Sequence, residues 1–347
     1  MRAVLFEGVR RLVCQEVPDP GILDPGDAIV AVRAAGVCGS DLHVYRGAEA
    51  GLDLGTPMGH ELAGEVVAVG SGVRGFAPGA RVASPFSTSC GICPACRRGL
   101  TARCVRGQLF GWVHEGKGLA GAQAELVRVP LADSTLVSIG DELPYEIAVL
   151  AGDVLATGAF GAEQAGAGPG AVIAVVGCGP VGLMAILGAR ELGAERVFAL
   201  DTVAERLALA EGYGAEPVPL DAHPVEWILA ATGGQGVDGV AEAVGSTSAL
   251  QLAYDLVRPG GAISALGVHN EPTFALAPAH LYDKNLTYRT GRCPARAYMD
   301  RLLPIATRRA GDLARMISHR LPLADGPHGY DLFDRRAEGC TKVILLP

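Results

Sequence analysis

Short apolar runs, bounded by glycine, proline or aspartate, recur along the first part of the chain, to about residue 151. They cover residues 28–34, 62–69 and 125–129. Runs of this length with such boundaries are typical of β-strands. The first part of the chain is therefore predicted to be rich in β-structure.

From residue 170 onward the pattern changes, because strand-length apolar runs alternate with stretches of helical length. The predicted strands are 171–176, 196–200, 239–244 and 262–266, and the predicted helices are 181–192, 203–213 and 248–257. Such alternation predicts a parallel sheet with helices covering its faces, which makes the fold class α/β. A further helical stretch, 297–309, and a closing strand, 342–346, follow.

The length of 347 residues predicts about two domains. Apolar residues make up 49% of the chain and charged residues 19%, which excludes an intrinsically disordered protein. The 48 glycines and 22 prolines are dispersed without the period of collagen, so they indicate frequent tight turns. The formal charge is -8 and no basic block could neutralise a run of phosphates, which argues against nucleic acid as a partner.

Residues 171–189 contain no charge and approach the length of a membrane span. Gly177, Gly179, Pro180 and Gly182 lie in the middle of this segment. A strand-turn-helix requires them there, whereas a lipid-exposed helix tolerates them poorly, so we expect no membrane segment. We expect no secretory signal, and the odd count of nine cysteines then predicts reduced thiols in the cytoplasm that are available for metal.

Residues 177–182 have the G-x-G-x-x-G spacing of a dinucleotide-binding loop. The loop directly follows a predicted strand and directly precedes a predicted helix, which is the context it needs. Gly177 is expected to make the tight turn, Gly179 to let the backbone approach the pyrophosphate, and Gly182 to let the helix pack closely on the strand. The candidate cofactor-binding residues in and before this loop are Thr157, Gly177, Gly179, Pro180, Val181 and Gly182.

Asp201 ends the next predicted strand, about 20 residues after the loop, where a carboxylate accepts hydrogen bonds from the adenosine ribose hydroxyls. An acid at this place would repel a 2′-phosphate, and residues 202–204 contain no arginine. These features predict NAD rather than NADP as the cofactor. The alternative is that the glycines only form a turn and that Asp201 is a solvated charge at a strand end.

Cys90, Cys93, Cys96 and Cys104 form the pattern C-x2-C-x2-C-x7-C. Four thiolates at such short spacings can close tetrahedrally on one zinc ion, which leaves no open position and makes the site structural. An iron-sulfur cluster also uses close cysteines, but its run usually ends in Cys-Pro, whereas Val105 follows here. Unligated thiols remain a further alternative. The sequence predicts a structural zinc lobe at about residues 88–106.

A second set of possible metal ligands precedes that lobe. Residues 38–43 read Cys-Gly-Ser-Asp-Leu-His, and residues 59–61 read Gly-His-Glu. A thiolate with an imidazole suits zinc, and a catalytic zinc needs only about three protein ligands because one position stays open for substrate. Taken singly, neither residue has to be a metal ligand. Cys38 can also be a small buried residue of the core, and His60 can also be a core or surface histidine.

Residues 59–66, Gly-His-Glu-Leu-Ala-Gly-Glu-Val, together with the segment at Cys38 and the four-cysteine lobe, resemble the zinc-dependent medium-chain alcohol dehydrogenases. The match covers essentially the whole chain, because the glycine loop and the closing strand follow in the expected order. It implies a GroES-like, β-rich catalytic domain at 1–156 and 292–347, with a Rossmann domain, a doubly wound parallel sheet, inserted at 157–291. It also implies a catalytic zinc held by Cys38, His60 and a third ligand, with Glu61 as an alternate or outer ligand.

The third ligand departs from the commonest family pattern. Many members have cysteine before the Thr-Gly that opens the cofactor domain, whereas this chain has Asp153. Aspartate at this place resembles the bacterial secondary-alcohol dehydrogenases and the formaldehyde-dehydrogenase-like members. A carboxylate is a competent zinc ligand, so Asp153 is the predicted third ligand, with a helix-cap or surface acid as the alternative. The expected cofactors are two Zn²⁺ ions per chain and NAD.

The resemblance implies the reversible oxidation of an alcohol to an aldehyde or ketone, in which zinc lowers the pKa of the alcohol oxygen and hydride passes to the nicotinamide. Ser40 and His43, three residues apart, can face the same side of a helical turn. In the family a hydroxyl at this place passes the proton through the cofactor ribose towards the histidine, so this pair is the candidate catalytic relay. A helix N-cap for Ser40 and a surface imidazole for His43 are the alternatives.

The expected partners are a small-molecule alcohol or carbonyl substrate and, from the resemblance, further copies of the chain in a tetramer or dimer. Alternative activities are those of a formaldehyde dehydrogenase or dismutase and of a polyol dehydrogenase. A non-catalytic NAD-binding protein is the alternative from another class, and the complete zinc ligands argue against it. A cofactor contact by Arg292 is left open, and the histidines left without a role are His114, His223, His269, His280, His319 and His328.

Overall fold

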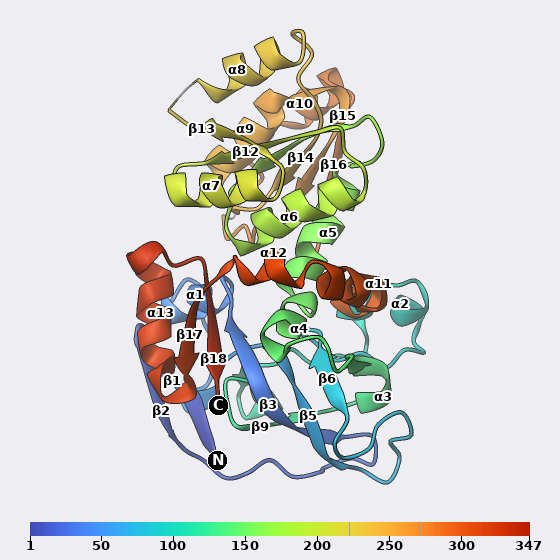
Figure 1. Cartoon of the computed structure of the whole chain (residues 1–347), viewed down its shortest axis with the longest axis vertical. Helices are drawn as coiled ribbons and strands as arrows, with labels where there is room; N and C mark the ends of the chain where they lie inside the picture. Colours follow the sequence, from blue (N-terminus) through green and yellow to red (C-terminus); the bar gives the residue numbers. More distant parts are fainter. Residues whose placement is uncertain (222, 272) are drawn as a thin grey trace. The chain divides into compact units, whose positions relative to one another are not determined.

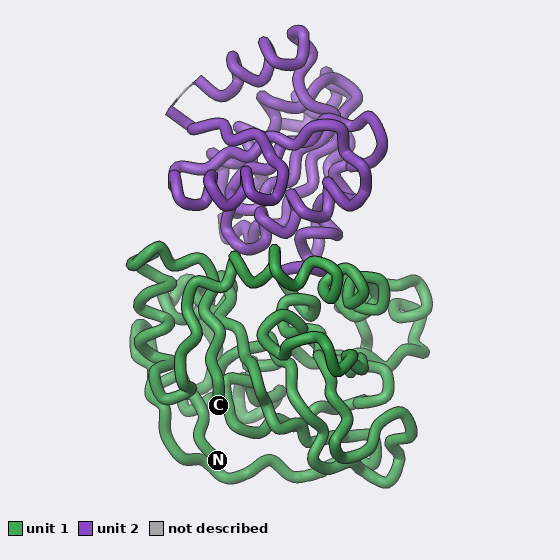
Figure 2. The backbone as a smooth tube through the Cα atoms, in the orientation of Figure 1, with its two compact units in different colours: residues 1–153, 294–347 green, residues 154–293 purple. Residues whose placement is uncertain are grey.

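The computed structural model describes residues 1–221, 223–271 and 273–347. The chain divides into two compact units, shown in different colours in Figure 2. Unit 1 contains residues 1–153 and 294–347, and unit 2 contains residues 154–293. Unit 1 is therefore built from both ends of the chain.

The largest sheet of unit 1 has seven strands in the order β10-β6-β5-β3-β18-β17, and β9 pairs with β3 (Figure 1). Its strands are β3 (Ala28–Val37), β5 (Glu61–Val69), β6 (Arg81–Ser84), β9 (Leu126–Val129), β10 (Val137–Ser138), β17 (Ile317–Pro322) and β18 (Lys342–Leu346). Strand β18 pairs antiparallel with β3, with Val343 opposite Val37. The C-terminal strand thus lies beside a strand from near the N-terminus.

Two smaller sheets and seven helices complete the regular structure of unit 1. The small sheets contain β1 (Arg2–Gly8), β2 (Arg11–Glu16) and β4 (Thr56–Pro57) in one, and β7 (Trp112–His114) and β8 (Lys117–Leu119) in the other. The helices are α1 (Asp41–Tyr45), α2 (Pro94–Arg97), α3 (Ala132–Thr135), α4 (Tyr145–Ala151), α11 (Ala295–Arg308), α12 (Ala310–Ala314) and α13 (Gly326–Arg335). Three short 3₁₀ helices are η1 (Thr101–Arg103), η2 (Leu323–Asp325) and η3 (Ala337–Gly339).

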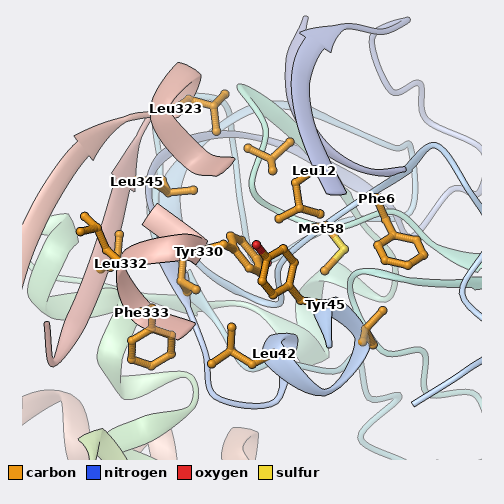
Figure 3. Close-up of a cluster of buried hydrophobic side chains, with 14 of the residues drawn as sticks. Phe6, Leu12, Leu42, Tyr45, Met58, Leu323, Tyr330, Leu332, Phe333 and Leu345 are labelled. Carbon is orange, nitrogen blue, oxygen red and sulfur yellow. The ribbon is translucent and has the colours of Figure 1, made fainter. Parts of the chain in front are cut away.

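A cluster of buried apolar side chains packs α1 and α13 onto strands of unit 1 (Figure 3). The rings of Tyr45 and Tyr330 lie at its centre, 5.6 Å apart between centroids. The hydroxyl of Tyr330 donates to Gln123 Oε1 over 3.0 Å, and Gln123 Nε2 donates to the main-chain oxygen of Gly36 over 3.0 Å. Because a buried hydroxyl needs a partner, this chain of bonds fixes the end of β3.

Unit 2 is a six-stranded parallel sheet in the order β13-β12-β11-β14-β15-β16. Its strands are β11 (Val172–Val176), β12 (Arg196–Asp201), β13 (Glu216–Pro219), β14 (Val237–Glu242), β15 (Val257–Ala265) and β16 (Thr287–Thr290). Its helices are α5 (Val154–Gln164), α6 (Pro180–Glu191), α7 (Ala204–Gly212), α8 (Pro224–Ala231), α9 (Thr247–Leu256) and α10 (Pro278–Asp283). The strand order reverses between β11 and β14, as in a doubly wound sheet, which confirms the predicted fold class.

Among the described residues, one helical stretch, Tyr145–Gln164, is long and apolar enough to cross a membrane by length and composition alone. Of its most apolar window, 78% is buried inside the protein, as in a core helix. The uncharged segment 171–189, which hydropathy alone would single out, is divided between β11 and α6. The strand-turn-helix prediction for that segment is confirmed.

Candidate metal and cofactor sites

The first candidate site lies where β3 ends and β5 begins. These strands are antiparallel, with Gly36 opposite Glu61, so Cys38 after β3 and His60 before β5 meet at one end of the sheet. Asp153 follows α4 and Gly152. A Cβ atom at Gly152 would overlap the main-chain oxygen of Ser84, so glycine is what lets this turn approach β6 closely enough to bring in Asp153.

Cys38, His60, Glu61 and Asp153 are all buried, and one ligand atom from each lies within 4.8 Å of the others. The Asp153 Oδ2 atom is 3.3 Å from Cys38 Sγ and 3.1 Å from His60 Nε2. A thiol, an imidazole and two carboxyl groups around one point are the donors that zinc prefers. The structure therefore brings together the four residues of the predicted catalytic zinc site.

Burial and the neighbouring charges shift the titration of this group. Burial, followed by the carboxylate of Asp153, raises the pKa of the Cys38 thiol to about 11. Burial alone would raise the pKa of Asp153, but the hydrogen bond and charge of His60 outweigh it and bring that pKa to about 2. Since a thiolate is the form of cysteine that binds metal, a cation at this point would offset the cost of ionising Cys38.

Asp41 orients two of the candidate ligands, a role that the sequence analysis missed. Its Oδ1 atom lies 3.0 Å from His60 Nδ1, and its Oδ2 atom accepts a hydrogen bond from the main-chain N–H of Cys38 over 3.0 Å. A carboxylate on the far ring nitrogen is the usual support of a metal-binding histidine, because it fixes the ring with Nε2 towards the site. The available signal was the spacing, since an aspartate often bonds to the main chain three residues away.

Glu61 has no solvent exposure and pairs with Lys342, which is also fully buried, with 2.6 Å between Oε1 and Nζ. Its other oxygen, Oε2, has no hydrogen-bond partner among the described residues. A Cβ atom at position 36 would overlap Oε2, so glycine at this position leaves room for the carboxylate as it lies here. An unpartnered buried carboxylate oxygen beside three possible zinc ligands fits a site that takes a cation. The sequence analysis missed Lys342, whose one signal was a charge at the start of an apolar strand.

Ser40 lies beside the same group. Its Oγ donates to Cys38 Sγ over 3.4 Å and lies 3.3 Å from His60 Nε2. Ser40 is the N-cap residue of α1, yet its side chain makes no capping hydrogen bond, so its hydroxyl faces the candidate ligands instead. His43 lies one helical turn further along the chain, and its main-chain N–H donates to the main-chain oxygen of Ser40 over 3.1 Å. Burial lowers the pKa of His43, which favours a neutral ring.

The four cysteines of the lobe also come together, with Cys90, Cys93, Cys96 and Cys104 offering sulfur atoms within 4.8 Å of one another. Cys104 Sγ accepts hydrogen bonds from the main-chain N–H groups of Cys90 and Arg106, over 3.2 and 3.4 Å. Main-chain hydrogen bonds, above all from Cys96, lower the pKa of Cys93 to about 6. Main-chain N–H groups directed at sulfur stabilise the thiolates that a zinc ion requires.

The glycine loop lies in unit 2, between β11 and α6. Gly177 has a φ of +89°, which favours glycine, and a Cβ atom on Gly182 would overlap the main-chain oxygen of Gly177. Of the other candidates, Pro180 and Val181 open α6 and Thr157 lies on α5. Thus the turn and the close helix-strand approach both depend on glycine, as the dinucleotide fingerprint requires.

Asp201 ends β12 beside this loop. Its Oδ2 atom accepts a hydrogen bond from the main-chain N–H of Cys178 over 2.7 Å, and Oδ1 accepts one from Val203 over 2.9 Å. Arg206 Nη1 lies 3.9 Å from Oδ2, a neighbour that the sequence analysis missed because it searched only residues 202–204 for a cation. Asp201 is thus held at the loop, with a positive charge nearby.

Comparisons with known proteins agree along the chain. Residues 24–141 match the alcohol dehydrogenase GroES-like domain, and residues 180–308 match the zinc-binding dehydrogenase domain. A zinc-type alcohol dehydrogenase B of Aspergillus flavus is 40% identical, over 99% of this chain and 81% of that protein.

Two solved structures cover the whole chain. The alcohol dehydrogenase TADH from Thermus sp. ATN1 is 42% identical, with a TM-score of 0.93 over 100% of this chain and 99% of that one. A protein described as a zinc-binding dehydrogenase from Sinorhizobium meliloti 1021, bound to NADP, is 29% identical, with a TM-score of 0.85 over 100% of this chain and 99% of that one.

Proposed function

The chain belongs to the zinc-dependent medium-chain alcohol dehydrogenases, and from that premise we propose that unit 1 is its catalytic domain and unit 2 its NAD-binding domain. The reaction is the oxidation of a small-molecule alcohol to an aldehyde or ketone with hydride transfer to NAD. The observation that carries the assignment is the buried group of Cys38, His60 and Asp153, with the unpartnered Oε2 of Glu61 beside it.

Cys38, His60 and Asp153 would hold the catalytic zinc, with Glu61 as an alternate or outer ligand, and a bound zinc would supply a Lewis acid for the substrate oxygen. Asp41 contacts Nδ1 of His60 and so keeps the other ring nitrogen, Nε2, directed at the site. Cys90, Cys93, Cys96 and Cys104 would hold the second, structural zinc. Lys342 balances the charge of Glu61, so that the buried carboxylates are not left facing one another alone.

Ser40 and His43 move the proton that leaves the substrate hydroxyl. Ser40 Oγ, beside both Cys38 and His60, is placed to accept that proton. His43, one helical turn away and half-buried, then receives it and releases it to water. Because burial lowers its pKa, the imidazole is neutral and able to accept a proton near neutral pH.

Replacing His43 by glutamine is expected to slow alcohol oxidation by about tenfold near neutral pH. The difference should shrink at high pH, where hydroxide replaces the relay, and at low pH, where protonation of His43 blocks the relay of the wild type as well. Wild-type activity should fall with decreasing pH as His43 becomes protonated, and this inflection should disappear in the variant. The measurement is kcat/KM against pH, with zinc content as the control. An unaltered pH profile would exclude His43 from the relay.

The dinucleotide is assigned to the glycine loop, with Asp201 as the acceptor for the adenosine ribose hydroxyls. The Asp201 carboxylate supports NAD as the cofactor. Arg206 lies near this carboxylate, and the 29% identical dehydrogenase structure contains NADP. Each hydrogen bond to the charged acceptor is worth about 1.5–3 kcal/mol.

Asp201→Gly is therefore expected to weaken NAD binding by about tenfold or more and to relax the discrimination against NADP. The further substitution Thr202→Arg should move the cofactor preference further towards NADP, because an arginine can pair with the 2′-phosphate. Specificity constants for both cofactors check this, and zinc content should not change. If the wild-type enzyme already uses NADP better than NAD by kcat/KM, the role given to Asp201 is wrong.

Assembly and location are part of the same proposal. The family resemblance implies a homo-oligomer, either a tetramer or a dimer, and the predicted reduced thiols favour a cytoplasmic location. Light scattering on the purified enzyme would give the mass of the assembly.

A panel of alcohols and aldehydes, each measured with NAD and with NADP, tests the proposed function. We expect turnover of at least one alcohol and a higher specificity constant with NAD. Cofactor binding without turnover of any compound by zinc-loaded protein would favour the non-catalytic alternative.

A further inference from the structure

The carboxylate of Glu242 is fully buried at the end of β14 in unit 2. Its Oε1 atom accepts hydrogen bonds from the main-chain N–H groups of Val244 and Gly245, each over 2.7 Å. Its main-chain oxygen accepts from Leu266 over 2.8 Å and Gly267 over 3.1 Å. One residue therefore holds the beginnings of two loops, the loop after β14 and the loop after β15.

His269 ties the second of these loops to the same carboxylate. Its Nε2 atom lies 3.0 Å from Glu242 Oε2, and its Nδ1 atom lies 3.5 Å from Glu271 Oε2. Glu271 Oε1 in turn accepts a hydrogen bond from the main-chain N–H of Thr247, the first residue of α9, over 3.1 Å. The imidazole thus links the end of β14, the loop after β15 and the start of α9.

The two loops also pack main chain against main chain. A Cβ atom on Gly245 would lie 2.7 Å from the oxygen of Val268, and one on Gly267 would overlap the nitrogen of Gly245. Val244 lies against the glycine loop, since a Cβ atom on Gly177 would be 2.5 Å from its Cγ2. A small movement of either loop would therefore displace Val244 from Gly177.

Val244 and Val268 are 52% and 49% exposed, although both are large apolar residues. They follow β14 and β15, on the side of β11 away from β12 and Asp201. A dinucleotide lies across the carboxyl ends of the strands at the point where the strand order reverses, here between β11 and β14. With the adenosine half at Asp201, the other half falls on the side of Val244 and Val268.

We propose that His269 is a positioning residue for the nicotinamide half of the cofactor. By bonding to Glu242 it holds the loops after β14 and β15 so that Val244 and Val268 present an apolar surface to that half. This inference rests on the proposed use of NAD. His269 itself contacts protein groups, so its effect on the cofactor passes through the two loops.

The pair His269→Asn and His269→Gln tests this, because the two side chains differ by one methylene group. The amide nitrogen of glutamine reaches the position of Nε2 and can donate to Glu242, whereas that of asparagine reaches only the position of Nδ1. The dissociation constants of NADH and of ADP-ribose, which lacks the nicotinamide, are measured by calorimetry on zinc-loaded enzyme. His280→Asn, on α10 of the same unit, is the matched control.

We expect His269→Asn to weaken NADH binding about tenfold, a loss of about 1.4 kcal/mol, and ADP-ribose binding less than twofold. His269→Gln should bind both ligands nearly as wild type does, and His280→Asn should change neither. Equal losses for the two ligands in His269→Asn, no loss, or no recovery in His269→Gln would overturn the proposal. Failure of the wild-type enzyme to bind NADH would instead overturn the proposed function.

Discussion

Replacing Asp153 by asparagine is expected to lower turnover roughly a hundredfold or more. Losing a residue that only hydrogen-bonds to a metal ligand already lowers activity or metal affinity about 10–100-fold, and loss of a ligand itself should cost at least as much. A neutral amide is a poorer zinc ligand than a carboxylate, and this one lies 3.3 Å from Cys38 Sγ and 3.1 Å from His60 Nε2. The zinc at the four-cysteine lobe should remain, so metal analysis should fall from two ions per chain towards one.

The matched control for this variant is Asp141→Asn, because that carboxylate is fully exposed and its contact with Arg81 is a surface ion pair. It should change neither turnover nor zinc content. Full activity of Asp153→Asn with both metals retained would show that Asp153 is not a ligand. The third position would then belong to Glu61.

Cys104→Ser is expected to remove the structural zinc and to lower the free energy of unfolding by at least about 3 kcal/mol. The reason is that the free energy of binding a structural metal contributes directly to the free energy of folding. Cys104 Sγ receives main-chain N–H groups from both Cys90 and Arg106, so its loss also leaves these donors without their sulfur acceptor. Thermal unfolding together with zinc analysis measures the effect.

Cys14→Ser provides the comparison for that substitution, since Cys14 is a half-buried cysteine on β2, outside the lobe. It should keep two zinc ions per chain and nearly wild-type stability. If Cys104→Ser matched it in both metal content and stability, the four cysteines would not be a structural zinc site.

The regular structure of unit 2 could be predicted because its signals are local. A strand-length apolar run, a G-x-G-x-x-G loop and a helix follow one another within residues 171–192, and the structure has β11, the loop and α6 in these places. Gly177 and Gly182 are required by a positive φ and by a close approach inside this same segment. Local sequence therefore contained most of the information that determines this part of the fold.

The supports of the candidate zinc site could not be predicted in the same way, because they come from distant parts of the chain. Lys342 reaches Glu61 only because β18 joins the sheet beside β3, a pairing that no local pattern reveals. Asp41 was within the recognised Cys38 segment, but its bond to His60 depends on how β3 and β5 meet. The candidate ligands could be named from spacing and resemblance, whereas their partners required the tertiary structure.

Diffraction data collected at the zinc absorption edge from crystals of the zinc-loaded enzyme test the central claim most directly, because they locate each ion. The account predicts two anomalous peaks per chain, one among Cys38, His60 and Asp153 and one among the four lobe cysteines. A single peak at the lobe, with no ion among Cys38, His60 and Asp153, would contradict it.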